Sequence, residues 1–223
     1  MGARILIHAC LEREWYVNDY LIPSIVEQGI DRDSIEIWLD KDRRGNLASW
    51  LACCEALQNR PGGTWHLQDD VLIARDFAKQ VKEHDDGIVC GFCHDLYETE
   101  GVQHIGRVYA FLMWQSSFPC IRIPNKVLKH FLEWYHSEAV YDGMTQKYIK
   151  TGKCDDTIFR LFMCSQRSRE RVYNLAPHIV EHVDYIIGGS TINKWRGYPA
   201  RGAYFYDDDL VDDLIQKLAK RRT

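Results

Sequence analysis

The sequence predicts an α/β protein with a mostly parallel sheet flanked by helices. Short apolar runs alternate with segments of helical periodicity through the first 92 residues, and polar or acidic side chains follow the ends of the first three runs. Alternation of this kind indicates strands joined by crossover helices, and it places a ligand site beyond the carboxyl ends of the strands. We therefore expect three loops to converge on one crevice.

Each expected element follows from its local pattern. The strands are short and apolar, whereas the helices carry apolar residues at intervals of three and four. Pro23 lies inside or near a break in the first helix, and Gly29 ends that helix. The expected strands cover residues 4–10, 34–40, 64–67, 87–92 and 116–124, with a short strand or turn at 177–184. The expected helices cover residues 15–28, 46–59, 74–84, 125–140, 155–166 and 207–222.

Composition indicates one soluble domain over residues 1–223. The chain is 46% hydrophobic and 27% charged, and no apolar run approaches the roughly 18 residues that a membrane span requires. The first expected strand starts almost at Met1, which leaves no room for a signal peptide and predicts a cytoplasmic protein. The formal net charge of −4 gives no global attraction to nucleic acid.

The eight cysteines lie mostly in apolar contexts, which is typical of buried, reduced thiols. Cys90 and Cys93 form a Cys-x-x-Cys pair, but this pair closes an apolar run instead of opening a helix. No second cysteine or histidine pair follows at zinc-ligand spacing. The sequence pattern therefore favours neither a redox nor a zinc function.

Two adjacent carboxylates, Asp69 and Asp70, follow the third expected strand and precede an expected helix start. Mg²⁺ and Mn²⁺ prefer oxygen ligands, and Mg²⁺ is often held by one or two carboxylates together with substrate phosphates. The alternative is a strand-to-helix turn in which one aspartate caps the next helix. The position of the pair in the strand-helix series favours the metal site.

The segment Leu67-Gln-Asp-Asp-Val71 is similar to the DxD-like motif of nucleotide-sugar-dependent glycosyltransferases with the GT-A fold. In that family the motif ends a central strand and holds a divalent metal on the nucleotide diphosphate. The resemblance implies that Asp70 is the preferred metal ligand and Asp69 the second choice. Gln68 stands at the first position, where the strict motif has an aspartate.

The resemblance also implies a nucleotide site. The family commonly uses an acidic residue at the end of the second strand to bind the nucleoside, and Asp40 has that position. A solvated strand end is the alternative. The loop after the first strand would border the base and ribose at Cys10, and Arg13 can reach a phosphate.

An acidic pair in the second half resembles the xED motif of inverting members. Asp155 and Asp156 open an expected helix, and the resemblance implies that Asp156 removes the proton from the acceptor hydroxyl. The alternative is that Asp156 caps the helix. Both interpretations assign a role to Asp156, so the sequence alone does not decide between a catalytic base and a helix cap.

Two further positions resemble elements of the family. Many members supply a C-terminal histidine as a metal ligand, and His182, with His178 as the second choice, lies before a Gly-Gly-Ser turn at residues 188–190. A structural histidine is the alternative. Trp114 lies in an aromatic and polar segment that is typical of a wall for the sugar or the base, and the same segment can equally be core.

Together these elements imply a metal-dependent, inverting glycosyltransferase with a UDP-sugar donor and Mn²⁺ or Mg²⁺ as cofactor, although a retaining outcome stays open. About residues 1–100 would bind the donor, about residues 101–206 would hold the acceptor and the catalytic base, and residues 207–223 would form a terminal helix. The acceptor is a saccharide, a protein, a small molecule or, in a phage-like enzyme, a hydroxymethylated DNA base. The DNA alternative depends on a basic group that can equally be a solvated helix face: Lys147, Lys150, Lys153, Arg160, Arg167, Arg169 and Arg171.

Two other classes of protein compete with this interpretation. A nucleotidyltransferase would carry a glycine-rich loop after its first strand, but the run from Ala9 to Arg13 has no glycine. A non-catalytic nucleotide-sugar-binding module would keep the fold without the chemistry, which Gln68 makes conceivable.

Overall fold

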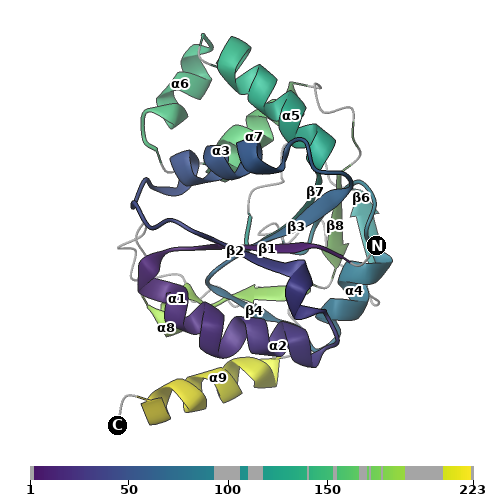
Figure 1. The fold of residues 1–223 in the computed structure, drawn as a ribbon, viewed down its shortest axis with the longest axis vertical. Helices are drawn as coiled ribbons and strands as arrows, with labels where there is room; N and C mark the ends of the chain where they lie inside the picture. Colours follow the sequence, from purple (N-terminus) through teal and green to yellow (C-terminus); the bar gives the residue numbers. More distant parts are fainter. Residues whose placement is uncertain are drawn as a thin grey trace.

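The protein is built on a mixed sheet with helices on both faces (Figure 1). The structure, a computed structural model, describes residues 3–92, 106–109, 118–139, 141–152, 155–165, 170, 172–176, 178–188 and 208–221. The strands of the main sheet are β1 (Ile5–Ala9), β2 (Ile35–Leu39), β3 (Gly63–Gln68), β5 (Ile88–Cys90), β6 (Gly106–Tyr109), β7 (Cys120–Pro124) and β8 (Val172–Ala176).

The strand order in this sheet is β2-β1-β3-β7-β5-β8-β6. β1 is parallel to β2 and β3, and β5 is parallel to β8, whereas β7 and β6 are antiparallel to their neighbours. Five of the seven strands therefore run in one direction. The expected α/β architecture is confirmed at this level, and two reversed strands interrupt the parallel arrangement.

The helices divide between the two faces of the sheet (Figure 1). Successive strand residues point to opposite faces, so Ile5 and Ile7 join one apolar core while Leu6 joins the other. One core packs against α3 (Asn46–Leu57), α5 (Asn125–Trp134), α6 (Gly143–Ile149) and α7 (Asp155–Cys164). The other packs against α1 (Glu14–Tyr16), α2 (Ile22–Glu27), α4 (Phe77–Glu83), α8 (Asp184–Ile187) and α9 (Asp208–Arg221).

The segment directly after Asp70 is a short strand that was not expected, and the helix expected at residues 74–84 is α4, which begins three residues later than expected. β4 (Val71–Ile73) pairs antiparallel with β9 (Val180–His182) in a separate two-stranded sheet, and α4 begins only at Phe77. A run of three apolar residues is too short to show a period, and its two β-branched residues favour a strand. The alternative in which Asp69 or Asp70 caps the next helix is wrong, because the N-cap of α4 is Asp76.

The first expected helix is divided into three parts. A wider, π-helical turn over Val17–Leu21 joins α1 to α2, and Pro23 lies in the first turn of α2. Proline has no N–H to donate to the preceding turn, and the regular helical turn is replaced by the wider π-helical turn directly before Pro23. The terminal helix expected at residues 207–222 is α9.

Burial of the cysteines agrees with the expectation at most described positions. Cys53, Cys54, Cys90 and Cys120 are buried, and Cys10 is half-buried, whereas Cys164 is exposed at the end of α7. The expectation of a buried Cys164 is therefore wrong, and Cys93 lies outside the described residues. Among the helices that the structure describes, none is both long and apolar enough to traverse a lipid bilayer.

Candidate functional site

The candidate site lies at the carboxyl ends of β1 and β3. β2 and β3 flank β1 on opposite sides, so the order in which successive strands are added to the sheet reverses at β1. In open α/β sheets, ligands bind at such a switch point, beyond the carboxyl ends of the strands. Cys10 follows β1, and Asp69 and Asp70 follow β3.

Arg13 joins the two carboxylates of the pair. Its Nη1 atom lies 2.9 Å from Asp69 Oδ1 and 2.5 Å from Asp70 Oδ2. The Cys10 N–H donates to Asp69 Oδ2 at 2.7 Å, and Arg13 Nε donates to the Gly188 carbonyl at 3.2 Å. Arg13, Asp69 and Asp70 are 7%, 6% and 6% exposed, so three charged groups lie almost out of water. Asp69 is thus held by the loop after β1.

His182 reaches Asp70 through the pairing of β4 with β9. His182 lies opposite Val71, and the Val183 N–H donates to the Asp70 carbonyl at 2.8 Å. His182 Nε2 is 3.1 Å from Asp70 Oδ2, and His182 Nδ1 is 3.5 Å from Asp184 Oδ1. The ligand atoms of Asp70, His182 and Asp184 all lie within 4.8 Å of one another. His178, the second choice, is instead buried with its ring 5.0 Å from that of Phe92.

The ionisable groups in this cluster shift one another's pKa values. Burial raises the pKa of Asp69, and the Asp70 carboxylate raises it further against the effect of Arg13. Burial acts on Asp70 too, but His182 and Arg13 outweigh it and lower the pKa of Asp70. For His182, Asp70 outweighs the opposite effect of burial and raises the pKa. Asp70 is therefore the more strongly ionised carboxylate of the pair.

The residues around Asp70 fit a divalent metal. Asp70 Oδ1 is buried and has no hydrogen-bond partner among the described residues, so it can act as a ligand. Asp70, His182 and Asp184 offer carboxylate oxygens and an imidazole nitrogen. Carboxylates suit Mg²⁺ and Mn²⁺. The sequence interpretation did not include Asp184, although its spacing two residues after His182 was a usable signal.

Asp40 serves the loop that follows β2. Its carboxylate accepts hydrogen bonds from the N–H groups of Arg44 at 3.1 Å and Gly45 at 3.0 Å, and its own N–H donates to the Ala9 carbonyl at 2.9 Å. Arg43 in this loop has a positive φ of 52°. Asp40 lies at the predicted strand end beside β1, and its binding to a nucleoside stays a prediction.

The acidic pair lies at the same edge of the sheet but on the α3 face. The Leu47 N–H in the first turn of α3 donates to the Gly152 carbonyl at 3.3 Å, which brings the start of α7 next to the loop after β2. Asp156 Oδ1 accepts from the Thr157 N–H at 2.6 Å. Because α7 begins at Asp155, Asp156 is a first-turn acid instead of the capping residue.

Both carboxyl groups of this pair hold protons more tightly than usual. Burial, assisted by Asp156, raises the pKa of Asp155 to about 7. Burial also raises the pKa of Asp156, against the hydrogen bonds from Thr157 and the charge of Arg160. Groups that titrate near neutral pH are suited to proton transfer.

Several predicted positions lie outside the described residues. These are Trp114, Lys153, Arg167, Arg169 and Arg171. Of the basic group, Lys147 and Lys150 are exposed at α6 and Arg160 is half-buried on α7.

Comparison with known proteins gives structural likenesses but no family. No family model matches the chain, and no curated protein matches it. Among solved structures, the chain is similar to the crystal structure of A197 from STIV, with 15% sequence identity and a TM-score of 0.42. The match covers 82% of this chain and 85% of that one. The fold and the site define an α/β protein with a carboxylate-histidine cluster at its switch point, buried at Asp70 and half-buried at His182 and Asp184.

Proposed function

We propose that this protein is a metal-dependent glycosyltransferase that moves a sugar from a nucleotide sugar to an acceptor hydroxyl. The observation that carries the proposal is the 3.1 Å approach of His182 Nε2 to Asp70 Oδ2. The GT-A resemblance selects these two residues as metal ligands although they are far apart in the chain. A simple turn after β3 requires no histidine beside it.

The donor diphosphate would bind between Asp70 and Arg13. Asp70, His182 and Asp184 would hold a Mn²⁺ or Mg²⁺ ion, which when bound neutralises the diphosphate and stabilises the leaving nucleotide. Arg13 uses Nη1 and Nε for Asp69, Asp70 and Gly188. Its Nη2 atom is not part of these bonds, so it can donate to a phosphate oxygen while the carboxylates keep the guanidinium in place.

Asp156 would act as the general base. Its raised pKa brings proton affinity toward the working pH, where a base is most effective. Removal of the acceptor proton, followed by attack on the anomeric carbon from the side opposite the nucleotide, gives inversion. Asp155, with a pKa of about 7, lies beside it as the second candidate.

The proposal specifies a UDP-sugar as donor and leaves four classes of acceptor: a saccharide, a protein, a small molecule or a hydroxymethylated DNA base. Exposed Lys147 and Lys150 on one helix are the described cations that a DNA backbone would contact. Phosphate contacts of this kind weaken as salt rises. Binding to duplex DNA that does not change with salt would remove the DNA acceptor from the proposal.

The experiment is incubation of the purified chain with a panel of nucleotide sugars and Mn²⁺, with release of the nucleoside diphosphate as the readout. We expect metal-dependent release of UDP that EDTA abolishes. For variants of the site aspartates, Asp85→Asn is the matched control that should keep this release, because Asp85 is an exposed aspartate before the amino end of β5. Binding without turnover would indicate a binding module, and release of pyrophosphate from nucleoside triphosphates would indicate a nucleotidyltransferase; either result contradicts the proposal.

A further inference from the structure

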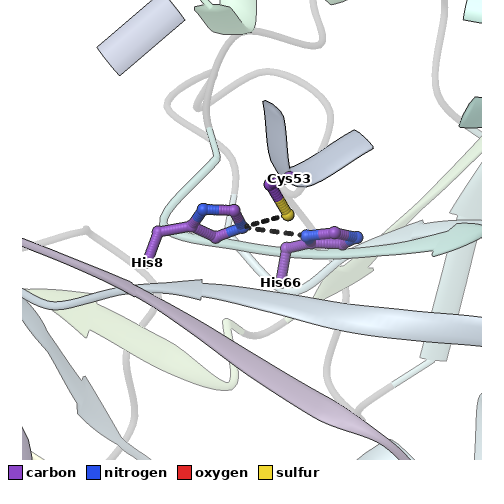
Figure 2. A group of neighbouring side chains, drawn as sticks. All are labelled: His8, Cys53 and His66. Atoms are coloured by element: carbon purple, nitrogen blue, oxygen red, sulfur yellow. Dashed lines mark hydrogen bonds between the residues drawn. The ribbon is translucent and has the colours of Figure 1, made fainter. Parts of the chain in front are cut away.

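A second group of potential metal ligands lies on the α3 face of the sheet. His8 on β1, His66 on β3 and Cys53 on α3 point toward one another (Figure 2). His8 Nε2 lies 3.0 Å from His66 Nδ1 and 4.0 Å from Cys53 Sγ. The three ligand atoms are all within 4.8 Å of one another.

The fold brings these residues together from three separate segments. β1 and β3 are parallel neighbours, with Leu6 opposite His66 and His8 opposite Gln68, so the two histidines are diagonal neighbours on one face of the sheet. Cys53 lies on the buried side of α3, which covers this face. No pattern of adjacent residues in the sequence encodes this site, since it depends on the strand register.

The three side chains are polar, but they lie among aromatic rings. The ring of Trp50 lies 5.4 Å from that of His8 and 5.0 Å from that of His66, and Phe118 packs on Trp50 at 5.0 Å. His66 is 1% exposed, and its Nε2 atom has no hydrogen-bond partner among the described residues. The His66 nitrogen that faces the cluster is Nδ1, and burial of two polar imidazole rings and a thiol in a mainly apolar core is costly unless the atoms that face one another share a partner.

We propose that His8 Nε2, His66 Nδ1 and Cys53 Sγ bind one zinc ion, or a similar borderline divalent metal. In a tetrahedral zinc site, the bond lengths place two nitrogen ligands roughly 3.3 Å apart and a nitrogen and a sulfur roughly 3.6 Å apart. The observed distances of 3.0 Å and 4.0 Å differ from these values by a few tenths of an ångström. The third distance, from His66 Nδ1 to Cys53 Sγ, is at most 4.8 Å, so side-chain movements of about an ångström are enough to complete the site.

Binding of the metal ion releases one proton, which comes from the Cys53 thiol. Burial lowers the pKa of His8 to about 4 and lowers that of His66, so both rings are neutral and can donate a lone pair. Burial raises the pKa of the Cys53 thiol. Formation of the metal–sulfur bond therefore transfers the thiol proton to solvent. Three protein ligands leave the fourth position for water, and half-buried His8 gives access to the site.

The experiment is titration of the metal-free full chain with Co²⁺, followed by competition with Zn²⁺. A thiolate ligand gives a sulfur-to-cobalt charge-transfer absorption that oxygen and nitrogen ligands cannot produce, so the ligand set Asp70, His182 and Asp184 does not contribute to the signal, and substitution of Cys53 separates its thiolate from the other cysteines. We expect one thiolate-bound cobalt per chain and its displacement by one equivalent of Zn²⁺.

Cys53→Ala and Cys54→Ala are a matched pair, because both remove one buried thiol from the same helix. The Cys54→Ala variant should keep the absorption, whereas Cys53→Ala should lose it together with roughly 100-fold or more in Zn²⁺ affinity. His66→Gln should weaken binding as well and serves as the second variant if Cys53→Ala does not fold. Absence of the band in the natural protein, or its persistence in Cys53→Ala, would overturn the proposal.

Discussion

One cluster of potential ligands lies beyond the carboxyl ends of β1 and β3, the other lies on the α3 face of the same sheet, and the two differ in charge. Around Asp70, buried carboxylates are balanced by Arg13 and His182, and each group depends on its neighbours for its protonation. Around His8, two imidazoles lie against the ring of Trp50 with the Cys53 thiol beside them, and burial lowers the pKa of both rings so that they are neutral. The first set suits hard cations that accompany phosphates, and the second suits zinc.

This difference predicts how each cluster responds when one member is removed. A buried charge that loses its partner is costly, because its neighbours must remain ionised in a place without water. A neutral ligand that is removed leaves only a small cavity or an unpaired nitrogen. The charged cluster should therefore be important for folding as well as binding, whereas the neutral cluster should be important mainly for metal affinity.

The largest expected effect on stability is that of Arg13→Met. The substitution keeps most of the buried stem but leaves Asp69 and Asp70 without their shared guanidinium. We expect the free energy of unfolding to fall by about 3–5 kcal/mol, as measured by urea denaturation.

Arg43→Met is the control for that measurement, because Arg43 makes an exposed ion pair with Glu12 at the same edge of the sheet. It should change the free energy of unfolding by less than about 0.5 kcal/mol. Equal effects of the two substitutions would mean that the buried ion pairs contribute no more than surface ones.

Asp156→Asn tests whether the α3 face carries the catalytic base. The substitution keeps an oxygen that can accept from the Thr157 N–H, so the start of α7 should be retained. We expect kcat to fall roughly 10²–10⁴-fold with UDP binding unchanged, since general bases contribute about that much. Steady-state rates and calorimetric titration with UDP and Mn²⁺ separate the two quantities. A variant with full activity would exclude Asp156 as the base.

Asp70→Asn tests whether the two clusters are independent. The variant should lose metal-dependent UDP binding, with Mn²⁺ affinity reduced roughly 100-fold, because the buried carboxylate is the central ligand of its cluster. Cobalt binding at Cys53 should not change, since the two ligand sets have no residue in common. The reverse pattern, with UDP binding retained and the cobalt absorption lost, would overturn both assignments.

The sequence predicted those parts of the site that depend on local pattern. Cys10, Asp40 and Asp69 follow strands whose apolar runs are evident, and the shared edge follows from parallel pairing. The contact between Asp70 and His182 was expected from the GT-A resemblance alone. The intervening β4–β9 pairing was not predicted, because a three-residue strand shows no period.

The His8–His66 pair was beyond reach of the sequence for a different reason. Each histidine lies within a buried strand, where it reads as a core residue. Their proximity depends on the register of β1 with β3, which is set by tertiary packing instead of local propensity. The involvement of Cys53 further requires α3 to cover that face. Nothing within one segment could reveal a cluster that three segments form.

The last expected effect concerns pH and Asp155, which lies beside Asp156 and near the buried Cys54 thiol on α3. The pKa of Asp155 is raised from 3.8 to about 7 in the folded chain. Between these values the folded state binds a proton that the unfolded state has lost. Stability from this group is therefore complete below pH 3.8 and declines as pH rises to about 7.

Asp155→Asn removes this dependence, because the amide stays neutral at every pH. Relative to the natural protein, the variant should gain up to about 4 kcal/mol in the free energy of unfolding between pH 4 and pH 8, since each unit of pKa shift is worth about 1.4 kcal/mol. Urea denaturation at each pH measures the difference, and Asp85→Asn is the exposed control. A constant difference between Asp155→Asn and the natural protein across that range would mean that Asp155 has the same pKa in the folded and the unfolded chain. Asp155 would then be ionised in the folded protein at neutral pH, as Asp70 is.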